Sequence, residues 1–332
     1  MDTSIFNHDA FSLSSLTVAI NEAPALPSRI RRLGLFEEEG ILTTSFTVEK
    51  DVDTLALIPN QSRSATPVTT GGSTRSLRTF STTHLPTQDI ITADDIQNLR
   101  AFGMASEVET MRAFVDRRLA KMRRRIDATI EYQRVGATKG QILDADGTTV
   151  ITNLFTEFGI AQNTHALSLN NANADLRGEV LAALEKAEEA LGAEPHNGFH
   201  AFCGREFFYK LIGHAKVQKS YEFYEGGVML RNDPRDGIPF GGVIWEQYRG
   251  AIAGTPFIGD DEAHLFPLGV DGMFITRYAP ANYVETANTI GLPLYAKTEP
   301  TPLGKGQLIE AQSNPLSICT RPRAVIKLSI AP

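Results

Sequence analysis

The chain has 332 residues, of which 42% are hydrophobic and 21% are charged, and its formal net charge is −7. This length exceeds the usual size of one domain and predicts two domains, or one domain with large excursions. The acidic balance argues against a protein whose main task is to grip nucleic acid, because phosphate neutralisation requires a basic excess.

The cysteine count and the hydropathy pattern argue against a disulfide-stabilised secreted protein and against a membrane protein. The only two cysteines, Cys203 and Cys319, cannot build a disulfide framework, which favours folding in a reducing cytoplasm. The first ten residues lack the basic and apolar segments of a signal peptide. No run of about 18 apolar residues occurs, so we expect no membrane span.

Residues 1–40 have the character of an arm that packs on another surface. Pro24 and Pro27 interrupt this segment, and its apolar residues follow no long period. It also contains a basic run, Arg29–Arg32, and an acidic run, Glu37–Glu39.

Residues 41–86 predict a long two-stranded excursion. Strand-like runs at 43–48 and 52–58 lead into a polar stretch at 61–74, and the chain returns through 74–85. A lone hairpin is only marginally stable in water. The segment is therefore either a flexible surface loop or a strand pair that is ordered by lying on a neighbouring subunit.

A long helix is predicted from about 106 to 135. Ser106 and Glu109 have the spacing of a capping box, and Gly136 is expected to end the helix. One apolar stripe with spacings of three and four follows the capping box: Val108, Met111, Val115, Leu119, Met122, Ile126 and Ile130.

The same helix carries many cations. Against one acid, Asp116, they are Arg112, Arg117, Arg118, Lys121, Arg123, Arg124 and Arg125. A solvated face is one interpretation, and pairing with acidic groups of a neighbour such as Glu37–Glu39 is another. DNA contact is the least favoured of the three.

Helices and strands are mixed in the rest of the chain. An Asp-Gly turn at 146–147 predicts a hairpin between 142–144 and 148–151, and helices are predicted at about 175–191 and 205–213. Strands are predicted at 198–203, 243–248, 273–278, 316–320 and 324–330. Because strands and helices do not alternate regularly, the predicted fold class is α+β.

Catalytic and metal-binding motifs are weak or absent in the sequence. His196, His200 and Cys203 could form a zinc site or a nucleophile pair, but a buried strand cysteine is more often a packing residue. The acidic run Gly259–Glu262 could bind a divalent cation, although a solvated turn is favoured. We therefore predict no catalytic, cofactor-binding or metal-binding residue and no enzymatic activity, with a Cys/His hydrolase as the remote alternative.

Several blocks of the second half resemble one family in their order. They are Gly198–Gly204, Phe207–His214, Ile238–Gly250, Ala263–Gly269, Tyr278–Ala281, Asn288–Lys297 and Gln312–Pro322. Together they are similar to the phage lambda-type major capsid protein, also called major capsid protein E. The resemblance implies the Hong Kong 97-like capsid fold of tailed phages.

This resemblance implies a division of the chain. Residues 1–40 would be the N-terminal arm and 41–86 the extended loop. Residues 87–165 and 296–332 would form a peripheral domain that contains the long spine helix, and 166–295 would form an axial domain.

The implied function is a capsid subunit of a tailed double-stranded DNA phage. It would form pentamers and hexamers in an icosahedral shell, and would fold and assemble in the host bacterial cytoplasm. Implied partners are further copies of the chain, a portal protein, a separate scaffolding protein, a possible decoration protein and packaged DNA without sequence-specific contacts. The shell of a gene-transfer particle or of an encapsulating compartment is the alternative.

Two departures from relatives of this fold affect assembly. Lys50 is the only lysine of residues 41–86, so we predict no covalent cross-links, and no long helical scaffolding segment is present. Arg75 and Arg78 are the first candidates for subunit contacts, against the alternative that they serve only solubility. The full candidate set is Glu37, Glu38, Glu39, Arg63, Arg75, Arg78, Arg117, Arg118, Lys121, Arg124 and Arg125.

Overall fold

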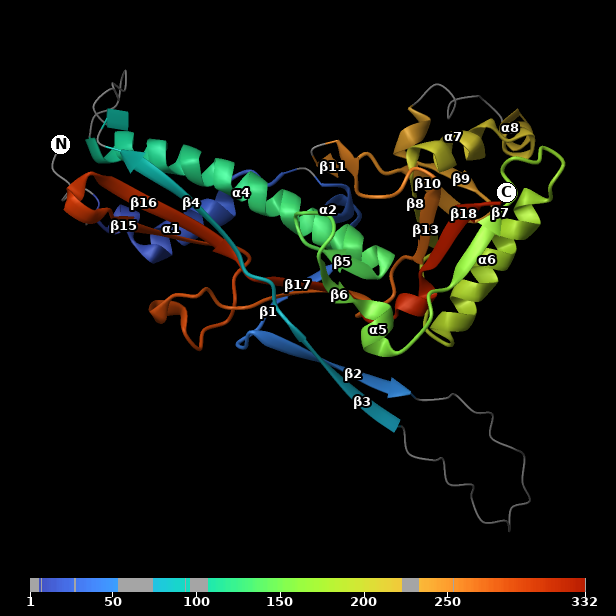
Figure 1. The fold of residues 1–332 in the computed structure, drawn as a ribbon, viewed down its shortest axis with the longest axis horizontal. Coiled ribbons are helices and arrows are strands. Elements are labelled where there is room, and N and C mark those ends of the chain that lie inside the picture. Colours follow the sequence, from blue (N-terminus) through green and yellow to red (C-terminus); the bar gives the residue numbers. More distant parts are fainter. Residues whose placement is uncertain are drawn as a thin grey trace, which may run out of the picture.

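Helix α4 (Glu107–Lys139) runs from one end of an elongated molecule to its middle (Figure 1). The computed structural model describes residues 6, 8–26, 28–52, 74–92, 94–95, 107–222, 233–252 and 254–331. The other helices are α1 (Leu13–Glu22), α2 (Arg29–Leu33), α5 (Leu154–Phe158), α6 (Leu176–Leu191), α7 (Arg205–Gly213) and α8 (Ala215–Glu222). Short 3₁₀ turns are η2 (Asp9–Phe11), η3 (Pro234–Asp236), η4 (Val284–Thr286), η5 (Pro302–Gly304) and η6 (Pro322–Ala324).

The apolar stripe of α4 is buried, as its spacing predicts. Six of its members, each at most 6% exposed, are Met111, Val115, Leu119, Met122, Ile126 and Ile130. They pack with Leu16 and Ile20 of α1 and with Ile309. Ser106 of the predicted capping box lies outside the described residues.

The prediction that Gly136 ends this helix is wrong, because α4 continues to Lys139. A Cβ atom at Gly136 would lie 2.8 Å from the carbonyl oxygen of Gln141 and 3.0 Å from Cα of Ile142. Glycine is therefore present because strand β5 (Gln141–Leu143) packs directly against the helix backbone.

One mixed sheet of six strands forms one end of the molecule. Its order is β7 (Thr164–Leu167), β18 (Ile326–Ile330), β13 (Glu262–Pro267), β8 (Phe199–Cys203), β10 (Val243–Gln247) and β9 (Ile238–Phe240). Strand β8 is parallel to β10 and antiparallel to β13. Helices α6 and α7 bury their apolar residues in the same core as this sheet.

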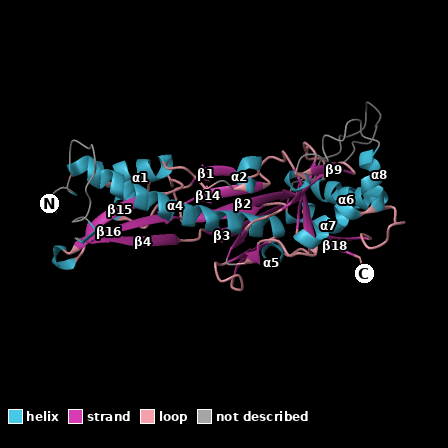
Figure 2. Ribbon diagram, turned by 90° about the horizontal axis from the view of Figure 1, so that it is seen from above, coloured by secondary structure: helices cyan, strands magenta, loops and turns pink. Residues whose placement is uncertain are grey.

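Two three-stranded sheets accompany α4. One has the order β1 (Glu37–Gly40), β14 (Phe274–Tyr278) and β17 (Pro315–Cys319), and the other has the order β15 (Tyr295–Pro300), β16 (Gly306–Ser313) and β4 (Leu85–Thr92). Two small hairpins pair β5 with β6 (Val150–Asn153) and β11 (Ala251–Ile252) with β12 (Thr255–Pro256). Seen from above, α1 and α2 lie toward one face of the flat molecule and α5 toward the other (Figure 2).

Strands β2 (Ser45–Val52) and β3 (Thr74–Ser81) form an antiparallel ribbon that projects from the body (Figure 1). Their register runs from Ser45 opposite Ser81 to Val52 opposite Thr74. The expected strand pair is thus present at the base of the excursion. Its polar turn lies outside the described residues.

Two strands pair across the limits of the proposed division, which itself stays a proposal. Strand β18, expected in the peripheral domain, lies between β7 and β13 in the six-stranded sheet. Its pairing with β13 places Ile326 opposite Leu265. Strand β14, expected in the axial domain, pairs instead with β1 and β17. The sheet to which each of these two strands belongs is set by its hydrogen-bonding partners, and those partners could not be identified from the order of the strands in the sequence.

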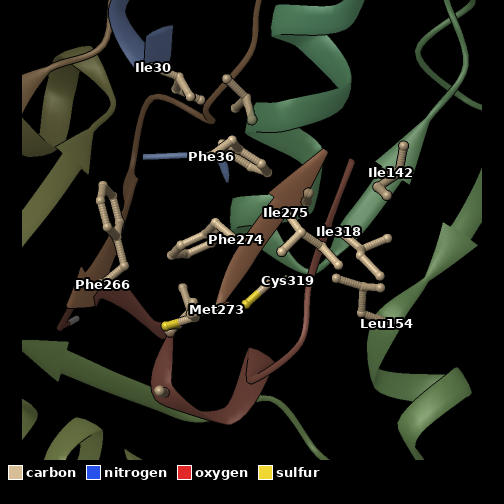
Figure 3. Packing of buried hydrophobic residues seen from close by; sticks show 14 of the residues in the cluster. Ile30, Phe36, Ile142, Leu154, Phe266, Met273, Phe274, Ile275, Ile318 and Cys319 are labelled. Atoms are coloured by element: carbon tan, nitrogen blue, oxygen red, sulfur yellow. The ribbon is translucent and has the colours of Figure 1, made fainter. Parts of the chain in front are cut away.

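A central core brings together residues of α2, α5, β5, β13, β14 and β17; Figure 3 shows part of it from close by. Phe266 of β13 meets Phe274 of β14, with ring centroids 6.0 Å apart, and Phe36 packs on the other side of Phe274 at 5.3 Å. Ile142 of β5 and Leu154 of α5 belong to the same cluster. Within the described residues, no helix combines the length and apolar character that spanning a membrane requires.

Candidate functional site

The acidic triplet Glu37–Glu39 forms edge strand β1 and pairs with its own chain. The Glu38 carboxylate lies 2.8 Å from the Arg134 guanidinium of α4 and accepts a hydrogen bond from the Tyr278 hydroxyl. Arg277 of β14 pairs with Glu37 at 3.0 Å and with Glu39 at 3.3 Å. The spine helix does meet this triplet, but within one subunit; a contact with a neighbour stays a prediction.

Arg134 and Arg277 are the partners that sequence reasoning missed. Both are buried, at 4% and 8% exposure, and both lie in segments whose apolar pattern predicted a helix and a strand. A buried cation needs an anion nearby. Arg277, inside the apolar run Phe274–Tyr278, was therefore an available signal for the triplet's location, whereas Arg134 follows Gln133 in a polar part of its helix.

Part of the basic face of α4 holds the N-terminal segment in place. Arg123 is 5% exposed and donates to the carbonyl oxygens of Ile20 and Asn21 at 2.6 Å. Arg118 donates to Asp89 of β4 at 3.0 Å. The interpretation of a freely solvated face is wrong for these two residues, because their guanidinium groups form hydrogen bonds with other residues of the same chain.

A second set of cations on α4 stays exposed. It comprises Arg117, Lys121, Arg124 and Arg125. Their spacing of three and four residues places them along one side of the helix. Arg117 donates to its own helix at Ala113 O, whereas the other three form no ion pair with any residue that the structure describes. Within the described side chains of α4, this exposed cationic stripe is free to contact a partner.

The loop arginines lie along the projecting ribbon. Arg78 is exposed and stands opposite Val48, and position 75 stands opposite Asp51. Side chains alternate along a strand, so positions 75 and 78 belong to opposite faces of the ribbon. Arg63 lies outside the described residues.

A buried charge cluster fixes α2 to the six-stranded sheet. Glu246 of β10 accepts from Arg29 Nε at 2.5 Å and lies 3.0 Å from His200 Nε2. Glu131 of α4 accepts from the Ile30 amide and from the Tyr248 hydroxyl at 2.8 Å. Polar contacts therefore position the N-terminal segment on both α4 and β10.

The cysteine and acidic candidates have structural partners. Cys203 and Cys319 are completely buried, and burial raises the pKa of both thiols, that of Cys319 to about 12. His200 directs Nε2 to Glu246. Glu262 pairs with Lys327 at 2.5 Å and lies 3.7 Å from Lys139. Its hydrogen bond with His264 and these two cations keep the pKa of Glu262 well below its usual range.

Comparison with known proteins decides the family. Residues 12–330 match the sequence model of the family described as Phage major capsid protein E. The chain belongs to this family. Two relatives are major capsid proteins: that of Salmonella phage Felix O1 (isolate Felix O1-VT1) is 28% identical over 95% of each chain, and that of Pseudomonas phage KPP10 is 26% identical over 96% of each.

Solved structures show the same fold. The putative capsid protein of a prophage from E. coli CFT073 has a TM-score of 0.59 at 14% identity, covering 96% of this chain and 99% of that one. The capsid protein of cyanophage P-SCSP1u has a TM-score of 0.51 at 13% identity, covering 93% and 90%. The predicted α+β fold of Hong Kong 97 type is thereby confirmed.

Proposed function

We propose that this major capsid protein forms the icosahedral shell of a tailed phage as pentamers and hexamers around double-stranded DNA. The β2–β3 ribbon is the observation that supports this most strongly, together with the family. Among the residues that the structure describes, its two strands pair only with each other, so both outer edges offer unpaired backbone groups. A neighbouring subunit that covers the ribbon would satisfy those groups.

The charge distribution fits contacts between different surfaces of identical chains. The cationic stripe of α4 and the exposed carboxylates of Glu37 and Glu39, at 51% and 64% exposure, lie on separate elements. Contacts between unlike patches of one chain are heterologous, and such contacts give rings when the rotation from one subunit to the next closes. Pairing between these two patches is the proposed contact between neighbours.

Further partners follow from the proposed shell. A separate scaffolding protein directs assembly in the host cytoplasm, a portal protein occupies one vertex, and a decoration protein reinforces a shell without cross-links. The DNA inside is held without sequence-specific contacts, and the net charge of −7 gives the chain no general affinity for phosphates. The arm, extended loop, peripheral and axial regions keep their proposed roles, with β18 reassigned to the axial sheet.

Negative-stain electron microscopy of the protein, purified after co-expression with its neighbouring genes, tests the proposal. Closed shells or rings of five and six subunits are expected. A uniform dimer or tetramer without larger species would contradict it and would reopen the hydrolase alternative around Cys203. Expression of the chain alone should not give uniform shells; if it does, the separate scaffolding protein is unnecessary.

A further inference from the structure

An apolar loop lies between β14 and β15, in residues 279–294. Three of its side chains are unusually exposed: Val284 at 92%, Ile290 at 65% and Leu292 at 44%. Leu42, at 59%, follows Ile41, whose carbonyl oxygen accepts from the Gly291 amide at 2.9 Å. Single exposed apolar residues are ordinary, but several on one short segment indicate an interaction surface.

This loop is held rigidly in place. Leu292 donates from its amide to the Tyr295 hydroxyl at 2.9 Å, and Thr289 donates to the Thr286 carbonyl oxygen at 2.8 Å. Gly291 packs so tightly that an added Cβ would collide with the backbone of Tyr278. A loop fixed before binding loses little conformational freedom on association, which is a property of binding surfaces.

The charges of the loop favour a protein partner. Glu285 and Lys297, the loop's acid and its neighbouring cation, pair with each other at 2.6 Å, so no cation is left for a phosphate. The bond between Ile41 and Gly291 also makes the loop continuous with the base of the β2–β3 ribbon (Figure 1). The ribbon exposes Leu77 at 66%.

We propose that a second copy of this chain covers Leu42, Val284, Ile290 and Leu292 in the assembled shell. The inference rests on the proposed function, because the copy that covers the ribbon is also the partner nearest to the loop. The apolar loop anchors the contact, and the ribbon extends it.

Thiol labelling of a Val284→Cys variant tests this contact. Cys203 and Cys319 are buried, so the new thiol is the one that a maleimide reaches. We expect rapid labelling of the unassembled protein and at least ten-fold slower labelling of assembled shells from which scaffolding and decoration proteins have been removed. Equal rates in both, or slow labelling of the unassembled protein, would overturn the proposal. Protection that requires a bound scaffolding or decoration protein would also overturn it.

Assembly of a Val284→Asp, Ile290→Asp double variant gives a second readout. Because both positions are exposed, its melting temperature should match that of the wild type, while its shell yield should fall at least ten-fold. The matched Val284→Ile, Ile290→Val variant should assemble normally. Normal assembly of the aspartate variant would refute the inference alone, whereas failure of the wild type to form shells would refute the proposed function.

Discussion

Arg29 and Glu246, 217 residues apart in the sequence, meet in a 2.5 Å hydrogen bond between α2 and β10. The Glu246 side chain is 5% exposed and also accepts from His200. Removing one partner of a buried pair leaves the others without an acceptor. This bond therefore ties the N-terminal segment to the six-stranded sheet.

Glu246→Gln should lower the free energy of unfolding by about 2 kcal/mol, allowing for the partial exposure of Arg29. Urea denaturation measures the change. Glu285→Gln, which breaks an exposed ion pair with Lys297, serves as the control and should change nothing measurable. Equal effects of the two variants would show that the buried carboxylate has no special role.

Stability should fall as the pH drops from 7 to 5 because of His264. This side chain is buried between Glu262, Lys139 and Lys327, and burial lowers its pKa below the ordinary value of 6.5. The unfolded state then binds a proton that the folded state excludes, so stability is retained above 6.5 and lost below it. Glu262, with its lowered pKa, adds a loss at more acidic pH.

Urea titrations at several pH values check the role of His264. The His264→Gln variant should show a shallower decline between pH 7 and 5, by at most about 1.4 kcal/mol per pH unit. His8→Gln, at an exposed position, should keep the wild-type slope. An unchanged slope in His264→Gln would locate the pH response elsewhere.

Gly136→Ala should destabilise the protein although alanine is the better helix former. Helix propensity favours alanine by about 1 kcal/mol, but the new Cβ meets backbone atoms of Gln141 and Ile142, which cannot rotate away. Overpacking of this kind costs about 1–3 kcal/mol, so the net effect is a loss. Ala128→Gly, in the same helix, measures propensity alone and should cost about 1 kcal/mol. A stabilised Gly136→Ala variant would show that β5 can move.

The sequence predicted elements with a strong local signal. The apolar stripe of α4 and the helix at 205–213 could be predicted because periodicity is a short-range property. Helix α1 was missed because its run is short and is followed by Pro24 and Pro27, and its apolar face is completed only by Leu16 and Ile20 packing on α4. The pairing of β18 with β13 and the pair Glu38–Arg134 depend on distant partners, which a single sequence does not specify.

Reversing the charge of the ribbon arginines should block assembly. Arg75→Glu with Arg78→Glu changes one position on each face of β3, opposite Asp51 and Val48 of β2. Shell yield measured by sedimentation should fall, while the circular dichroism spectrum stays unchanged. The Arg75→Lys, Arg78→Lys variant keeps the charge and should assemble. Normal shells from the glutamate variant would leave these residues a role in solubility alone.

Mature particles should run as a single monomer band on denaturing gels without heating. The segment 41–86 offers only Lys50, near its base, as an amine for a covalent bond to a neighbour. A ladder of bands above the monomer would refute this prediction. A Lys50→Arg variant then shows whether that residue forms the link, since only a lysine-dependent ladder should disappear.

The position of β18 means that the six-stranded sheet cannot form completely until the last part of the given sequence has been synthesised. Residues 326–330 lie between β7 (164–167) and β13 in one sheet, so a nascent chain that has already produced both neighbours still lacks the strand that joins them. Until β18 emerges, two sheet edges stay open and invite pairing with other nascent chains. Chains that lack β18 therefore cannot form the complete sheet. A subunit becomes competent for assembly only after residues 326–330 have been translated.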